Sequence, residues 1–252
     1  LCSAAARNAT AEQSKLVAES ERLSTALLNS ISHELRTPLA AITTASATLS
    51  ETRKADGQLS QAMIAEIQEA SARLNRLVGN LLDVTRLESG RVQAKLDWCD
   101  VGDLIHTTVS SLERELSKYA VKVEIAAQMP LAKLDFTLMQ QAIANLLLNA
   151  AAHTPVGTEI LLQARRENAE LILSVADNGP GLPADLLPRV FDKFIRAEHA
   201  PAGGTGLGLA IVKGFVEAHS GKISAENRPS GGAMFTIRLP QSELPPATKS
   251  AA

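Results

Sequence analysis

Apolar residues recur at helical spacing through the first 90 residues of the chain. At about 100° per residue, five apolar side chains between residues 16 and 49 fall on one face of a helix. They are Leu28, Ile31, Leu35, Ile42 and Leu49. Pro38 lacks a backbone N–H and crowds the preceding turn, so we expect a kink beside it. The helical pattern then breaks over residues 52–59.

A second helical pattern follows the break. Its apolar positions are separated by alternating steps of four and three residues, which is the spacing of a coiled-coil seam. They are Met63, Ile67, Ala70, Leu74, Leu77, Leu81 and Val84, and Gly90 follows where a helix C-cap favours glycine. The two helices predict an antiparallel hairpin. Since one hairpin covers only part of such a stripe, we expect two copies to form a dimeric four-helix bundle, with packing against the C-terminal half as the alternative.

After Gly90 the pattern changes to shorter segments of strand and helix character. The predicted strands are 92–97, 120–127, 159–166, 170–176, 222–226 and 233–239, and the predicted helices are 101–116, 136–152 and 206–220. This mixture predicts an α+β sandwich, in which helices cover one sheet. The tail that begins at Pro240 is rich in Pro, Ser and Ala, and we expect it to be disordered.

Composition narrows the class of protein. The 252 residues carry a formal net charge of -2 and are 45% hydrophobic but only 3% aromatic. No basic excess indicates nucleic acid, and no apolar run reaches the ~18 residues that span a bilayer, so we expect a soluble, cytosolic piece without membrane contact. The chain begins at Leu1 without a signal-like segment, which indicates a fragment of a longer protein. Cys2 and Cys99 lie too far apart for a disulfide framework or a metal-ligand motif.

An ionisable cluster interrupts the first helical segment, with the sequence Ser32-His33-Glu34-Leu35-Arg36-Thr37-Pro38-Leu39. His33 points roughly opposite the apolar face, Glu34 is its neighbour, and Thr37 lies one turn further along the same side. A structural histidine would normally lie in the apolar stripe, so this position favours a reactive side chain. A solvated surface histidine is the alternative.

Three polar clusters mark the C-terminal half. The first is Asn145 and Asn149, which lie four residues apart on one predicted helix face. Their amide oxygens can bind a hard cation such as Mg²⁺ while the NH₂ groups donate to phosphate. Ordinary surface polarity is the alternative for this pair.

The second cluster is Asp177-Asn178-Gly179-Pro180-Gly181, which comes directly after an apolar predicted strand. A carboxylate at a strand end can accept a hydrogen bond from an exocyclic amine, and the glycines let a flat ring approach the backbone. A tight turn is the alternative, because Asn-Gly and Pro-Gly are common turn dipeptides.

The third cluster is Gly203-Gly204-Thr205-Gly206-Leu207-Gly208-Leu209, at the start of a predicted helix. Backbone N–H groups at a helix N-terminus favour a polyphosphate. The cluster is neither a Walker loop nor a dinucleotide fingerprint, because no Gly-Lys-Ser/Thr follows and no strand runs directly into it. A mobile loop is the alternative.

Together and in this order, the four clusters resemble the two-component sensor histidine kinases. The segment 32–39 resembles the phospho-acceptor motif of that family, and the later clusters resemble its Bergerat-type (GHKL) α/β sandwich, which binds ATP. The similarity covers about residues 16–240, and residues 203–239 are similar to KdpD-type sensors linked to potassium transport. It implies an N-terminal extension (1–15), a dimerisation and phosphotransfer hairpin (16–90), a catalytic ATP-binding domain (91–240) and a disordered tail (241–252).

The resemblance assigns chemistry to the first cluster. His33 would be the phosphorylated nucleophile, and Glu34 would orient the imidazole and accept its proton. Thr37 would position a water for the reverse activity, dephosphorylation of the partner. The implied partners are a second copy of the chain and the receiver domain of a response regulator. The full-length protein would be anchored in the cell membrane.

The resemblance also implies an ATP site that uses Mg²⁺. Asn145 and Asn149 would hold Mg²⁺ and phosphates, and Asp177 would recognise the adenine amine. Gly179 and Gly181 would shape the base pocket, and the phosphates would be wrapped by Gly204, Gly206, Leu207 and Gly208. Phe191 and Phe194 would anchor the lid, with an ordinary core position as the alternative. Arg196 would neutralise charge on the γ-phosphate, with a solvated arginine as the alternative.

One position departs from the family pattern. Many relatives carry Lys or Arg three residues after the second asparagine, where this chain has Ala152. His153, Lys193 or Arg196 could supply the missing phosphate contact, and the short segment 198–203 predicts a compact lid. Two rival functions follow: a dimeric scaffold or degenerate kinase that binds nucleotide without transferring phosphate, and an ATPase of the same fold in which His33 is incidental.

Overall fold

The computed structural model describes residue 32 and residues 34–50, 57–196 and 205–242. The chain divides into two compact units, Leu1–Gly79 and Asn80–Ala252. The predicted N-terminal extension, the helical residues before 32 and the tail after 242 lie outside the described residues. Within the described part, no helix combines the length and apolar character that crossing a membrane requires.

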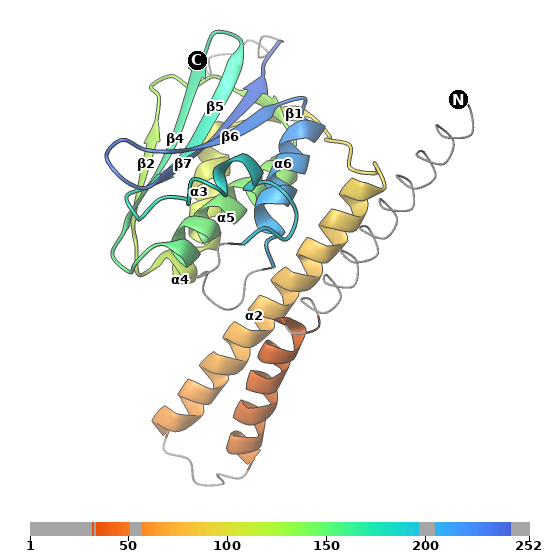
Figure 1. Ribbon diagram of the computed structural model, residues 1–252, viewed down its shortest axis with the longest axis vertical. Coiled ribbons are helices and arrows are strands. Elements are labelled where there is room, and N and C mark those ends of the chain that lie inside the picture. Colours follow the sequence, from red (N-terminus) through yellow and green to blue (C-terminus); the bar gives the residue numbers. More distant parts are fainter. Residues whose placement is uncertain (1–31, 33, 51–56, 197–204, 243–252) are drawn as a thin grey trace, which may run out of the picture. The chain divides into compact units, whose positions relative to one another are not determined.

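The first unit contains a helical hairpin, as predicted. Residues 34–50 are helical through Pro38, and α2 (Gly57–Glu88) follows after residues 51–56, which lie outside the described part (Figure 1). Each predicted seam position of α2 is buried or half-buried, whereas Ile64 and Val78 between them are exposed. The predicted break was too long, because residues 57–59 already belong to α2, which begins at Gly57.

Glycine ends α2 where the sequence predicted. Gly90 adopts a φ of 63°, in the left-handed region, and its N–H donates to the carbonyl of Leu87 at 3.0 Å. The N–H of Arg91 reaches back to the carbonyl of Arg86, also at 3.0 Å. These two bonds satisfy the last carbonyl groups of the helix in a Schellman motif.

The predicted strand over residues 92–97 was wrong. Residues 91–96 form no strand, and β1 (Asp97–Cys99) pairs antiparallel with β3 (Ala132–Leu134), a strand that the sequence did not predict. The N–H of Lys95 donates to the Asp135 carboxylate at 2.9 Å. The Asp135 side chain therefore accepts a backbone N–H that a longer β1 would have used for pairing.

The predicted helix 101–116 forms as two helices, α3 (Val101–Ser111) and α4 (Glu113–Leu116). Leu112 leaves helical geometry with φ -112° and ψ 16°, and its N–H donates to the carbonyl of Val109, only three residues back. The Ser111 hydroxyl donates to the carbonyl of Thr108 at 2.7 Å. These local bonds compete with the i to i−4 ladder and end α3.

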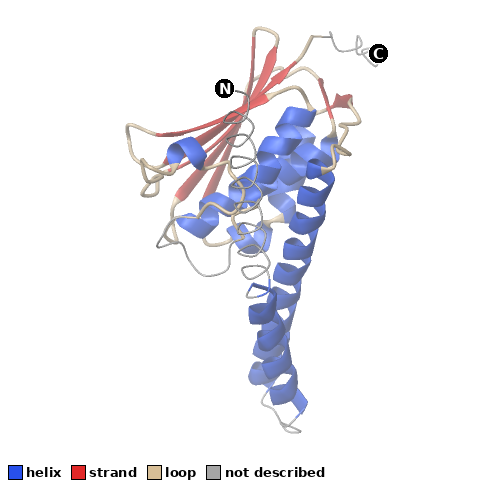
Figure 2. Ribbon diagram, turned by 45° about the vertical axis from the view of Figure 1, so that its right-hand side comes forward, coloured by secondary structure: helices blue, strands red, loops and turns tan. Residues whose placement is uncertain are grey.

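A five-stranded mixed sheet forms the second unit, in the order β2-β4-β5-β7-β6. The strands are β2 (Ala120–Ile125), β4 (Glu159–Glu167), β5 (Glu170–Asp177), β6 (Lys222–Asn227) and β7 (Ala233–Pro240). β2 pairs parallel with β4, and the other pairs are antiparallel. Helices α3, α5 (Phe136–His153) and α6 (Gly208–Ala218) cover one face, which confirms the α+β sandwich (Figures 1 and 2). α6 begins two residues later than predicted.

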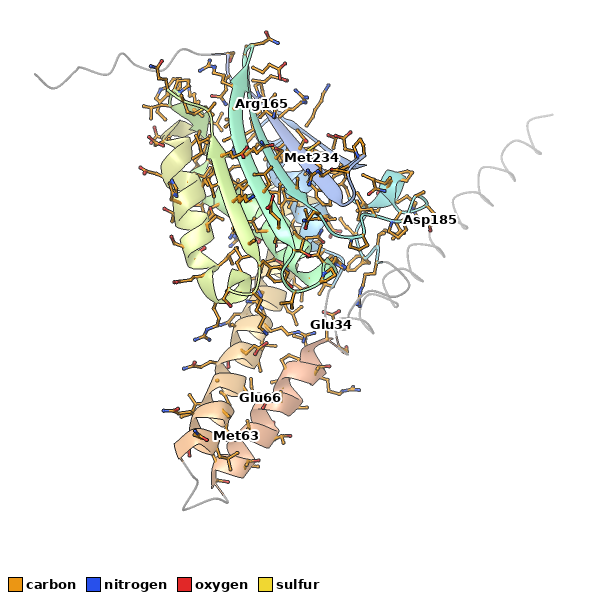
Figure 3. All side chains as sticks on the ribbon, turned by 90° about the vertical axis from the view of Figure 1, so that its left-hand side faces the viewer. Glu34, Met63, Glu66, Arg165, Asp185 and Met234 are labelled. Atoms are coloured by element: carbon orange, nitrogen blue, oxygen red, sulfur yellow. The ribbon has the colours of Figure 1, made fainter. Side chains whose placement is uncertain are left out.

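Alternation along β5 separates the two faces of the sheet. Leu171, Leu173 and Val175 belong to the core shared with the helices. On the opposite face, Ile172 pairs with Arg165 of β4 and Ala176 pairs with Met234 of β7, and Figure 3 labels Arg165 and Met234. Because β5 is buried on both faces and paired on both edges, its carboxyl end is a rigid platform for the residues that follow.

Candidate functional site

A pocket lies where α5, the end of β5 and the start of β7 meet, and it brings together Asn149, Asp177 and Gly181, three of the residues predicted to bind the nucleotide. The remaining lining residues are Ala150, His153, Thr154, Pro180, Leu182, Ala233 and Phe235. The lining combines an apolar wall with a carboxylate and a carboxamide, a composition typical of small-molecule sites.

Asp177 is the last residue of β5 and is only 4% exposed. Its Oδ1 atom accepts hydrogen bonds from the N–H groups of Gly179, at 2.9 Å, and Ala233, at 3.2 Å. Two backbone donors on different segments therefore fix the plane of the carboxylate at the pocket wall. A carboxylate held in this way can accept a hydrogen bond from a ligand amine without rearranging.

The glycines after Asp177 stand where a side chain would collide. A Cβ atom on Gly179 would lie 2.5 Å from Cγ2 of Thr154, and one on Gly181 would lie 2.8 Å from Oδ1 of Asn227. Gly181 also has a φ of 80°, which glycine adopts without strain. The chain bends at residues 179 and 180, in keeping with the turn that the sequence suggested, and the approach of a flat ring to this backbone stays a prediction.

The third cluster lies next to the asparagine pair. A Cβ atom on Gly208 would come within 3.7 Å of Oδ1 of Asn145, so the start of α6 faces the middle of α5. Leu207 is fully buried, and its N–H donates to the hydroxyl of Thr205 at 3.3 Å. The start of α6 therefore lies beside Asn145, and a helix N-terminus favours a phosphate. Gly204 lies outside the described residues.

The two phenylalanines occupy different settings. The Phe191 ring packs edge-on against Phe235, with centroids 6.2 Å apart, so it is anchored to the core. Phe194 has a φ of 66°, and its N–H donates to the carbonyl of Gly206 at 2.8 Å. This bond joins the two sides of the segment that contains the predicted lid, whose residues 198–203 lie outside the described part.

Three residues were candidates for the cationic contact missing at Ala152. Burial lowers the pKa of His153, the nearby Arg196 cation lowers it further, and Asp177 opposes both. The imidazole is therefore mostly neutral at pH 7, although part of its surface is exposed, and it does not replace a lysine. Lys193 forms an ion pair with Glu88, with 2.6 Å between Nζ and Oε1, and Arg196 is exposed, so both cations stay candidates for this contact.

The N-terminal cluster belongs to the first unit. Glu34 is buried, at 5% exposure, and Thr37 is exposed on the same helix. His33 lies outside the described residues. The prediction that this cluster lies on the exposed face of the helix therefore holds for Thr37 and not for Glu34.

Sequence reasoning missed three residues that shape the pocket: Thr154, Asn227 and Arg228. Thr154 touches Gly179, Asn227 bonds the backbone of Leu182, and Arg228 donates to the carbonyl of Asp177. The close approach of Thr154 depends on packing that no local pattern records. Asn227 and Arg228 stand at the end of a predicted strand, next to a Gly-Gly turn, which is a signal for a constrained loop.

The described residues contain no group of three or more His, Cys, Asp or Glu side chains able to hold a metal ion. Cys99 is a free thiol whose pKa is raised by burial and by the neighbouring carboxylates of Asp97 and Asp135. A divalent cation would thus depend on the amide oxygens of Asn145 and Asn149 together with oxygens of the ligand, a donor set suited to Mg²⁺.

Comparison with known proteins gives two adjacent domains. The family model "His Kinase A (phospho-acceptor) domain" matches residues 23–90. The model "Histidine kinase-, DNA gyrase B-, and HSP90-like ATPase" matches residues 134–243.

Among curated proteins, the sensor protein KdpD of Escherichia coli (strain K12) is 36% identical over 238 residues, which is 94% of this chain and 26% of the relative. The chain thus spans about a quarter of the length of this relative. Full-length ShkA, solved in complex with AMPPNP, is 26% identical with a TM-score of 0.62, over 82% of this chain and 44% of that one. The Acinetobacter baumannii histidine kinase AdeS shares the fold at 22% identity and a TM-score of 0.62, over 84% of this chain and 98% of that one.

A phospho-acceptor helical region followed by an ATPase domain of this fold defines the catalytic portion of a sensor histidine kinase, and the chain belongs to this family. The two matched ranges thus correspond to the phospho-acceptor region and the ATPase domain of that family. Within the family it is KdpD-like, as its similarity to KdpD of E. coli and of Clostridium acetobutylicum shows.

Proposed function

We propose that this chain transfers the γ-phosphoryl group of Mg·ATP to a ring nitrogen of His33 and then to an aspartate of a response regulator. The observation that carries the proposal is the pocket in which Asp177, Asn149 and Gly181 converge. Its fixed carboxylate is suited to the adenine amine, and Asn145 with the first turn of α6 lies where a triphosphate could follow.

ATP binding divides among five sets of residues. The Asp177 carboxylate accepts a hydrogen bond from the adenine amine, and Gly179 and Gly181 keep the base pocket narrow. Mg²⁺ neutralises phosphate charge when bound, and Asn145 and Asn149 would hold it through their amide oxygens. The N–H groups around Gly204, Gly206, Leu207 and Gly208 would bind the phosphates, and Arg196 would neutralise charge on the transferring group.

The transfer step forms a nitrogen–phosphorus bond at His33 and breaks the bond between the γ-phosphorus and the bridging oxygen, so ADP leaves. Glu34 orients the imidazole and accepts its proton, a base role worth roughly 10²–10⁴-fold in rate. Thr37, which is exposed, positions a water for the opposite activity, dephosphorylation of the regulator.

The helical hairpin supports a homodimer. Leu39, Ile64 and Val78 are 50%, 48% and 45% exposed in the single chain. A second hairpin would cover these apolar side chains and complete a four-helix bundle, which would also present His33 to the regulator's receiver domain. The chain spans about a quarter of the sensor protein KdpD, and we propose that the full-length protein is anchored in the cell membrane.

The direct test is incubation with γ-labelled Mg·ATP. Wild-type chain should acquire label that is lost in acid and kept in base, as expected for a phosphoramidate. The His33→Gln variant should acquire none, while His106→Gln, which changes an exposed histidine of α3, should label like wild type. Acid-labile label on His33→Gln would disprove the assignment of His33.

A degenerate kinase is the second candidate, and the neutral His153 beside Ala152 favours it, because neither residue supplies a cation to the phosphates. Tight nucleotide binding without label on the wild-type chain would support that function. Phosphate release that continues in His33→Gln would instead support an ATPase of the same fold.

A further inference from the structure

The turn between β6 and β7 is bonded to both ends of the segment Asp177–Leu182, which forms one wall of the pocket. Asn227, the last residue of β6, makes two hydrogen bonds to the backbone of Leu182. Its Oδ1 accepts the N–H at 2.7 Å, and its Nδ2 donates to the carbonyl at 2.8 Å. One carboxamide thus satisfies both backbone groups of a residue that lies outside any strand.

Arg228 holds the other end of the segment. Its Nη1 donates to the carbonyl of Asp177 at 2.8 Å, in a half-buried position. The turn that carries Arg228 is itself closed by two backbone bonds, from Arg228 to Gly232 at 2.9 Å and from Gly231 to Arg228 at 3.0 Å. The guanidinium is therefore presented from a well-defined turn.

The same turn packs directly on Asp177. A Cβ atom on Gly232 would lie 2.0 Å from the Asp177 carbonyl oxygen, so only glycine permits this contact. The next residue, Ala233, donates its N–H to Oδ1 of Asp177 at 3.2 Å. Backbone, side chain and packing contacts from one turn thus converge on the residue that faces the ligand.

We propose that Asn227 and Arg228 are positioning residues that fix the base pocket and thereby set its selectivity for adenine, an inference that rests on the proposed ATP-binding function. Residues 178–182 form no helix or strand. Asn178 still pairs with Glu159 of β4, donating its N–H to the carbonyl at 3.3 Å and accepting the Glu159 N–H at Oδ1 at 2.9 Å, and residues 179–182 lie beyond this last bond between the two segments. Without the Asn227–Leu182 bonds or the Arg228–Asp177 bond, the segment 178–182 can shift, and with it the Asp177 carboxylate, whose Oδ1 accepts from Gly179. The carboxylate would then be displaced from the 6-amino group. The proposed triphosphate contacts come from α5 and α6, which the bonds of Asn227 and Arg228 do not reach.

The effect of a variant on different nucleotides distinguishes a positioning role from a general effect on the stability of the turn. A weakened fold would reduce binding of every nucleotide in parallel. A displaced Asp177 would reduce binding of ATP, which offers the 6-amino group, and would change binding of inosine triphosphate much less, because that nucleotide has an oxygen at the same position. The ratio of the two dissociation constants is therefore the informative quantity.

The experiment measures dissociation constants of Mg·ATP and Mg·inosine triphosphate for the whole chain and for the variants Asn227→Ala and Arg228→Met, together with thermal unfolding of each. The wild type should prefer ATP. Each variant should lower that preference by about threefold to tenfold, the size of one or two lost hydrogen bonds. Arg228→Lys should keep most of the preference, because an ammonium can still donate to the Asp177 carbonyl. Arg238→Ala, which removes an exposed ion pair with Glu170, is the matched control and should leave the ratio unchanged.

An unchanged ratio in both Asn227→Ala and Arg228→Met would overturn the inference while leaving the proposed function intact. If Asn227→Ala does not fold, Asn227→Asp keeps the acceptor for Leu182 N–H and loses only the donor, and it must still lower the ratio. A wild-type chain that binds neither nucleotide would overturn the proposed function itself, and the inference with it.

Discussion

The Nε2 atom of His219 accepts a hydrogen bond from the backbone N–H of Asp135 at 2.9 Å, which ties the end of α6 to the start of α5. Since Nε2 accepts, the proton lies on Nδ1, which donates to the carbonyl of Phe215 at 2.7 Å. Asp135 in turn caps α5 by accepting the N–H of Leu138 at 3.1 Å. The two helices that carry the asparagine pair and the glycine cluster are therefore joined at their far ends.

Replacing His219 by Leu should destabilise the catalytic domain, because the residue is buried and the N–H of Asp135 would lose its acceptor. The expected loss in the free energy of unfolding is about 1–3 kcal/mol, measured by denaturant titration. His219→Gln, whose amide oxygen can replace Nε2, should recover part of that loss. Equal stability of His219→Leu and wild type would contradict this role.

Replacing Gly206 by Ala should weaken nucleotide binding. Gly206 has a φ of 65°, and an added Cβ would lie 2.8 Å from the backbone of Phe194 and Ile195. The backbone bond from Phe194 to Gly206 would then break, and the first turn of α6 would shift. Gly157→Ala is the matched control, since Gly157 also has a positive φ, of 88°, but no atom lies within 4 Å of its added Cβ. An equal effect of both variants on ATP affinity would show that backbone strain alone, and not the contact with residues 194–195, explains the loss.

Stability of the chain should depend on pH through His153. Because burial and Arg196 lower the pKa of this residue in the folded state, the unfolded chain binds its proton more tightly. Stability is therefore unaffected above the unfolded value of about 6.5 and falls as pH decreases from there through the lower folded pKa. Denaturant titrations between pH 7.5 and pH 5, about one unit above and about 1.5 units below the unfolded pKa, should detect the fall. A His153→Gln variant should lose this part of the dependence, and an identical profile in both proteins would exclude His153 as its source.

Replacing Asp177 by Asn should lower the affinity for ATP by roughly 10- to 100-fold, because a charge-assisted hydrogen bond to the adenine amine would be lost. Oδ1 of the new side chain can still accept from Gly179 and Ala233, so the fold should be retained, as thermal unfolding would check. Glu170→Gln, at the other end of β5, provides the control and should bind like wild type. Unchanged affinity in Asp177→Asn would remove this residue from the base pocket.

Periodic signals predicted the elements that pack through regular faces. The seam from Met63 to Val84, the strands β4 and β5 and helix α5 all follow the predicted pattern closely, because each repeats one burial rule over many residues. The glycine stop at Gly90 was equally predictable, since only the local backbone determines it.

Elements fixed by distant contacts were not predictable. Strand β3 is three residues long and exists because β1 pairs with it, and the segment before β1 is held by the Asp135 side chain, forty residues away in sequence. The candidate site shows the same limit. Its chemical groups were visible as local clusters, but the contacts of Thr154, Asn227 and Arg228 depend on the assembled sheet.

Strand β7 lies between β5 and β6 and pairs with both. During synthesis the chain must therefore reach Pro240 before the sheet can close, although Asp177 and the other residues of the base pocket emerge from the ribosome earlier. Until then β5, an apolar strand, has an unpaired edge on the side of β7, which is a site for misassociation with other nascent chains. A nonsense mutation at Ala233, which removes β7 and all residues after it, should therefore produce an insoluble product and not a weakened kinase.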